Sequence, residues 1–86
     1  MFVDASAIIA VLSHEPEAAR ISDALMVAET PFTSPVTVLE TAIALARPDK
    51  FDLPIEAVEP IVLEFLDERG IEIRDLPPAA QATTLA

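Results

Sequence analysis

Three very short apolar segments, separated from one another by long helical stretches, constrain the fold of this chain most strongly. They are residues 1–3, 32–33 and 71–73. Short apolar runs between helical segments are typical of buried parallel strands, because strands that run in the same direction need a long crossover connection. Right-handed crossovers then place the helices on the faces of the sheet. The sequence therefore predicts an α/β fold in the order β-α-α-β-α-α-β-α.

The helices between these strands have recognisable ends. They are expected over residues 5–12, over a segment that opens at Pro16 and reaches Ala28, over residues 36–46 and 56–69, and from Ala79 onward. Ser6 is a candidate cap for the first helix, and Ser34 followed by Pro35 is a strong start for the third. Gly70, the only glycine, is placed to end the fourth, because glycine adopts the left-handed backbone at a helix end without strain.

The helix at residues 56–69 has the clearest amphipathic pattern. Its expected apolar stripe consists of Val58, Ile61, Val62, Phe65 and Leu66. Most of the acidic residues lie on the other side, and Pro60 falls in the first turns, where proline is tolerated best. This pattern predicts that the stripe faces the core.

The composition limits the class of protein. Eighty-six residues suit one domain, and residues 1–86 are expected to form it. The chain combines 52% hydrophobic residues with a net charge of -10, which calls for a well-covered core or a partner surface and argues against binding to anionic membranes. It has no cysteine and one histidine, which argues against a structural zinc site. Without a spanning run or a signal peptide, the chain is expected to be cytoplasmic.

Asp4 directly follows the first apolar run. Ligands of parallel sheets bind beyond the carboxyl ends of the strands, so a carboxylate here is placed at the mouth of a site. A helix N-cap is an equally good interpretation of the same position. Ser6 follows two residues later, and its hydroxyl either caps the helix or binds a water or metal.

Glu40 lies in the middle of the third expected helix. Its neighbours Val38, Leu39, Ala42 and Ile43 are apolar, so no side of this helix is clearly exposed to water. Burying an isolated glutamate is costly, and the cost falls if the side chain faces a metal or a polar cleft. The alternative is a narrow solvent stripe that Glu40 shares with Thr37, Thr41 and Ala44.

Several stretches together resemble the PIN-domain proteins, in particular toxins of the VapC type. Residues 2–7 resemble the start of that family, residues 33–40 its second motif, and residues 70–73 followed by Leu76 its third strand. The break at residues 14–18 is similar to the family's break before its second helix. Each motif alone is weak, but their order and spacing together are fairly specific.

The resemblance implies a three-layer α/β/α domain with a parallel sheet and a Mg²⁺-dependent endoribonuclease activity, with Mn²⁺ as the other possible ion. Asp4 matches the family's first carboxylate and Glu40 its second, as catalytic and metal-binding residues, and Ser6 matches a small polar neighbour. The resemblance also implies single-stranded RNA as substrate, a cognate antitoxin protein as partner, and a homodimer.

The family supplies further aspartates downstream, and this chain stops before that region. Residues 79–86 contain no acidic side chain, and the last expected helix has no stop signal. The domain is therefore expected to be incomplete at its C-terminus, with half of the acidic site present.

Two other functions remain open. One is a non-catalytic interaction module that dimerises or binds an antitoxin. The other is a phosphatase of the haloacid-dehalogenase type, which also starts with an aspartate after an apolar strand, but which usually has a second aspartate where this chain has Ser6.

His14 has no second histidine or cysteine to pair with and is expected to be a solvated loop residue.

Overall fold

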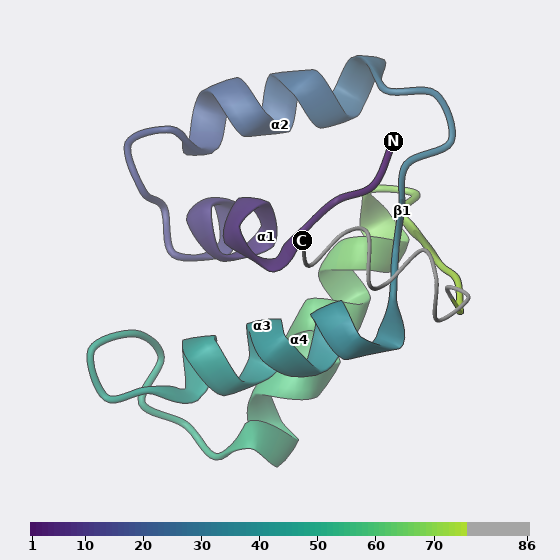
Figure 1. The fold of residues 1–86 in the computed structure, drawn as a ribbon. Coiled ribbons are helices and arrows are strands. Elements are labelled where there is room, and N and C mark those ends of the chain that lie inside the picture. The colour runs from purple at the N-terminus through teal and green to yellow at the C-terminus, as the bar shows by residue number, and fades with distance from the viewer. Residues whose placement is uncertain (76–86) are drawn as a thin grey trace, which may run out of the picture.

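The computed structural model describes residues 1–75, so the helix expected from Ala79 onward lies outside the described residues. Four helices and two short strands follow one another along this part of the chain (Figure 1). They are α1 (Ala5–Leu12), α2 (Ala18–Val27), β1 (Phe32–Thr33), α3 (Pro35–Ala46), α4 (Ile55–Glu68) and β2 (Glu72–Ile73). The predicted order is confirmed from α1 to β2.

The sheet is parallel, as predicted. β1 pairs with β2 through Phe32 opposite Glu72 and Thr33 opposite Ile73. The first apolar run contributes only a single bridge, between Phe2 and Phe32, so the strand expected over residues 1–3 is reduced to one paired residue. Its backbone direction is nevertheless fixed, since Val3 N–H donates to the Phe32 carbonyl at 2.8 Å. The three predicted strand segments therefore lie side by side in chain order.

The start of α3 follows its sequence signals closely. Ser34 is the N-cap, its hydroxyl accepts a hydrogen bond from the Thr37 N–H at 3.1 Å, and Pro35 is the first helical residue. Proline is suited to this position because the N–H that it lacks would have no helical partner there. The second helix is different, because it begins at Ala18 and leaves Pro16 in the preceding turn.

The end of α4 depends on glycine. Arg69 is the C-cap, and Gly70 follows with φ +66°. Gly70 N–H donates to the Asp67 carbonyl and Ile71 N–H donates to the Leu66 carbonyl, the bond pattern of a Schellman motif. The chain thereby reverses directly into β2, and the predicted role of Gly70 is confirmed.

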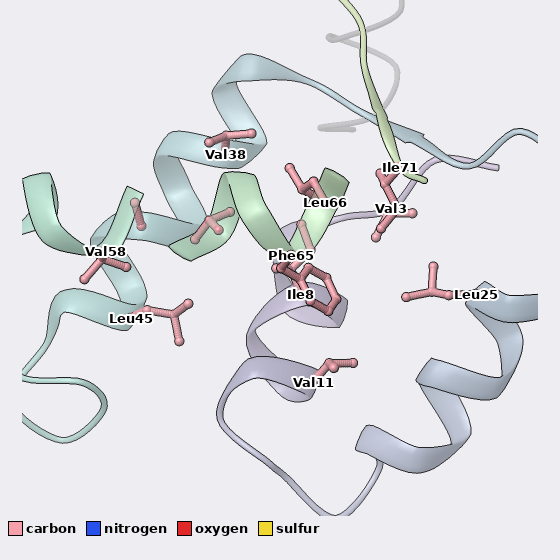
Figure 2. Close-up of a cluster of buried hydrophobic side chains, with 12 residues drawn as sticks. Val3, Ile8, Val11, Leu25, Val38, Leu45, Val58, Phe65, Leu66 and Ile71 are labelled. Atoms are coloured by element: carbon pink, nitrogen blue, oxygen red, sulfur yellow. The ribbon is translucent and has the colours of Figure 1, made fainter. Parts of the chain in front are cut away.

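One hydrophobic core joins α1, α3 and α4 (Figure 2). Ile8, Leu45, Val58 and Val62 are fully buried in it. α1 lies between α2 and α3, and α3 packs on α4 (Figure 1). The stripe predicted for α4 is confirmed except at Ile61, which is 37% exposed. None of the helices in residues 1–75 is long and apolar enough to span a membrane.

Candidate acidic site

Asp4 is fixed at the point where the first strand segment becomes α1. Its backbone is extended, and one carboxylate oxygen, Oδ1, accepts hydrogen bonds from Ala7 N–H at 3.0 Å and from Ser6 Oγ at 2.7 Å. Asp4 is thus the N-cap of α1, the structural role that the sequence left open. Within residues 1–75 no hydrogen bond or ion pair engages the other oxygen, Oδ2, and the side chain is exposed. A carboxylate held by one oxygen presents the second one to a ligand.

Ser6 does not cap α1, contrary to the prediction. Its hydroxyl points back to Asp4, because the strand-ending aspartate already occupies the capping position. Ser6 is therefore placed to orient the Asp4 carboxylate, while its own side chain remains exposed.

Glu40 is exposed to solvent on α3, so the cost of burying it, which favoured a metal-binding role, does not arise. The solvent stripe expected with Thr37 and Thr41 is also wrong, since both threonines are buried. They tolerate burial because their hydroxyls are satisfied locally. Thr41 Oγ1 donates to the Thr37 carbonyl at 2.7 Å, and Thr37 Oγ1 lies 2.9 Å from Ser34 Oγ.

The exposed side of α3 is mainly apolar around Glu40. Val36, Leu39 and Ile43 are each about half exposed, at 52%, 49% and 49%. A shallow groove of about 250 Å³ lies beside this side, lined by residues of α3, α4 and β2 that include Glu59. Glu40 is therefore the single carboxylate of α3, on a side of this helix that is otherwise mainly apolar.

The helices that carry Asp4 and Glu40, α1 and α3, both start at the same edge of the sheet. α1 starts directly after the first strand segment, α3 starts directly after β1, and the two helices pack against each other. Asp4 lies at the first of these junctions, and Glu40 lies in the second turn of α3. This edge is the one where parallel sheets bind ligands.

The donor set suits a hard cation. Asp4, Ser6 and Glu40 offer oxygen atoms only, and Mg²⁺ is commonly held by one or two carboxylates with water completing its shell. No three His, Cys, Asp or Glu side chains within the described part of the chain gather into a group that could hold a metal ion. These residues therefore fit Mg²⁺ as partial ligands and fit a closed, zinc-type site poorly.

Four of the five Lys and Arg side chains have local partners. Arg74 pairs with Glu72 at 3.0 Å and stacks over Phe32, and Arg47 pairs with Asp49 at 3.1 Å. Lys50 lies 3.8 Å from Glu15, and Arg69 lies over Phe65. His14 is exposed in a turn, as expected. The described residues thus form no basic patch for a nucleic-acid backbone.

Comparison with known families decides the class of this protein. The sequence profile of the PIN domain matches residues 1–85. The chain belongs to the PIN-domain family. PIN domains are generally nucleases and typically use divalent metals, which agrees with the α/β fold and the oxygen donors described above. No curated protein matches this PIN domain closely.

Family membership also bears on the alternatives. The match covers both Asp4 and Glu40, and it gives no support to a haloacid-dehalogenase phosphatase.

One residue of interest was not singled out by the sequence. Thr33, at the end of β1, is fully buried and donates a hydrogen bond to the Val3 carbonyl. Two signals pointed to it: it is a polar residue that ends an apolar strand, and it opens the stretch at residues 33–40 that resembles the family's second motif.

Proposed function

We propose that this PIN domain is a Mg²⁺-dependent endoribonuclease of the VapC type, with Asp4 and Glu40 as half of its acidic site. Mn²⁺ is the other candidate ion. The supporting observation is the fixation of Asp4 by one oxygen at the carboxyl edge of the sheet, beside the helix that carries Glu40. The family's further aspartates have no counterpart among residues 76–86, which contain no acidic side chain, so the proposal covers half of the site.

In this proposal Asp4 and Glu40 would hold the metal, which supplies an activated water and neutralises charge on the scissile phosphodiester. Ser6 and the Ala7 N–H keep Asp4 Oδ1 in place, so that Oδ2 faces the same direction in every molecule. Such preorganisation matters because misplaced ligands lose much of the electrostatic stabilisation of the transition state.

The proposed partners are single-stranded RNA, a cognate antitoxin and a second copy of the chain. The net charge of -10 favours a partner with basic residues. The half-exposed apolar residues of α3 around Glu40 offer a surface on which an apolar segment would bury area that is now in contact with water.

A non-catalytic interaction module is the second candidate. It is favoured by the absence of any group of three potential metal ligands within residues 1–75. Such a module would use the apolar side of α3 without cleaving RNA. The two functions differ in one assay, since only the nuclease requires both carboxylates and a metal.

The test is cleavage of single-stranded RNA with Mg²⁺, using the chain with any sequence that follows Ala86 in its gene. Asp4→Asn and Glu40→Gln are each expected to lower the rate at least about 100-fold, because each removes a charged ligand. Glu64→Gln is the control, since Glu64 is also an exposed carboxylate in the middle of a helix. Equal cleavage by the wild type and the three variants would refute the site. A wild type that cleaves no RNA with either Mg²⁺ or Mn²⁺ would favour the interaction module.

A further inference from the structure

Thr33 occupies an unusual place at the end of β1. It is fully buried, and its hydroxyl Oγ1 donates a hydrogen bond to the Val3 carbonyl at 2.7 Å. Its own carbonyl accepts a hydrogen bond from Arg74 N–H at 2.8 Å. Thr33 therefore ties the middle strand to both neighbours, to one through its backbone and to the other through its side chain.

The side-chain bond replaces a rung of the parallel ladder. Phe32 N–H donates to the Met1 carbonyl and Val3 N–H donates to the Phe32 carbonyl, the pattern of one parallel bridge. The next rung would join Ser34 N–H to the Val3 carbonyl. Ser34 instead turns the chain into α3 as its N-cap, and the Thr33 hydroxyl takes the Val3 carbonyl. A buried carbonyl that the ladder would leave unpaired is thereby satisfied.

The bond between the Thr33 hydroxyl and the Val3 carbonyl holds the backbone directly before Asp4. The Val3 carbonyl belongs to the peptide unit that leads into Asp4, so its hydrogen bond fixes the plane of that peptide. On the other side, Thr33 is joined directly to Ser34, the cap of the helix that carries Glu40. One hydroxyl thus links the origins of the two carboxylate-bearing helices.

We propose that Thr33 is a positioning residue of the acidic site, which orients Asp4 relative to α3 through its hydrogen bond to the Val3 carbonyl. The inference rests on the proposed function, since positioning has a chemical consequence only if Asp4 binds a metal. Thr33 touches neither metal nor substrate in this role. It acts as an outer-shell residue, of the kind whose loss weakens metal binding through misplaced ligands.

Thr41 provides a matched control. It is the same residue type, it is equally buried, and its hydroxyl also donates a 2.7 Å hydrogen bond to a backbone carbonyl. That carbonyl belongs to Thr37 of the same helix, so the bond links nothing outside α3. Thr33→Val and Thr41→Val therefore remove the same chemical group, but only the first removes a link between elements. Thr33→Ser keeps the hydroxyl and is the conservative rescue.

The experiment measures Mn²⁺ binding by electron paramagnetic resonance of the free ion. Wild type, Thr33→Val, Thr33→Ser, Thr41→Val and Asp4→Asn are compared at a temperature where circular dichroism shows each to be folded. We expect Thr33→Val to weaken binding about 10-fold, as outer-shell changes do. Thr33→Ser and Thr41→Val should stay within about twofold of wild type, because the link to Val3 is intact in both.

Amide hydrogen exchange on the same proteins gives a second reading that needs no metal. Thr33→Val should speed exchange of the Val3 and Ala7 amides, whose acceptors depend on the alignment of the two segments, and Thr41→Val should not. Asp4-dependent Mn²⁺ binding that is equal in Thr33→Val and Thr41→Val would overturn the positioning role alone. Mn²⁺ binding that does not depend on Asp4 would overturn the proposed function. If Thr33→Val also leaves the exchange of the Val3 and Ala7 amides unchanged, the structural link through Thr33 is overturned as well.

Discussion

The two helices α3 and α4 pack against each other, yet their outer sides differ in chemistry. On α4 the outer side carries five exposed acidic residues, Glu56, Glu59, Glu64, Asp67 and Glu68, among which Ile55, Ile61 and Leu63 are 38%, 37% and 39% exposed. On α3 it carries Val36, Leu39 and Ile43, each about half exposed, around the single carboxylate of Glu40. Both helices thus bury one side in the core, but the outer side of α4 is mainly acidic and that of α3 is mainly apolar.

The acidic residues of α4 and the single carboxylate of α3 call for different explanations. A row of carboxylates on an amphipathic helix keeps the helix hydrated and needs no ligand to explain it. A lone carboxylate within exposed apolar residues contributes little to hydration, and apolar patches of this kind mark sites of association. Glu40 is thus distinguished from Glu64 by its surroundings, although both are exposed and lie in the middle of a helix.

The largest expected effect contrasts the two sides of α3. Leu45 is fully buried against α4, whereas Ile43 is 49% exposed on the outer side. Leu45→Ala should lower the free energy of unfolding by about 2–5 kcal/mol, because it removes apolar contacts and leaves a cavity. Ile43→Ala should cost less than about 1 kcal/mol, as surface changes usually do. Urea denaturation measures both, and equal losses would contradict the assigned inner and outer sides.

Substitutions on the outer sides of α3 and α4 should have smaller effects on stability, and only those on α3 should affect self-association. Ile43→Ser on α3 and Ile61→Ser on α4 alter residues that are 49% and 37% exposed, and each should change the free energy of unfolding by less than about 1 kcal/mol. If the apolar side of α3 is the partner surface, only Ile43→Ser should weaken self-association. Sedimentation velocity measures this, and equal weakening by the two variants would remove the distinction between the helices.

The fold was largely predictable because its signals are local. Alternating short apolar runs and helical segments predicted the parallel order, Ser34 with Pro35 predicted the start of α3, and Gly70 predicted the end of α4. The first strand segment was overestimated, since only Phe2 pairs with β1. Pairing length depends on the neighbouring backbone, which a run of apolar letters does not encode.

The site was less predictable because it depends on three-dimensional neighbours. Asp4 was recognised from its position, but the choice between cap and ligand is not exclusive, since one oxygen caps α1 and the other has no bond among the described residues. The exposed side of α3 was wrongly assigned, because Thr37 and Thr41 were taken as polar surface residues beside Glu40. The Thr41 hydroxyl bonds within α3 and the Thr37 hydroxyl bonds to the N-cap Ser34, which allows both threonines to be buried. Thr33 was missed because its partner, Val3, is thirty residues away in the sequence.

The most direct test of the central claim is paramagnetic broadening of amide signals by a small amount of Mn²⁺. If Asp4 and Glu40 bind the ion, signals around residues 4–7 and 39–41 should broaden first, while those around Glu64 should persist until more Mn²⁺ is added. This result would separate the lone carboxylate of α3 from the acidic row of α4 in one spectrum. Broadening that begins along α4, or that spreads evenly over all exposed carboxylates, would contradict the assignment of Asp4 and Glu40 as a metal site.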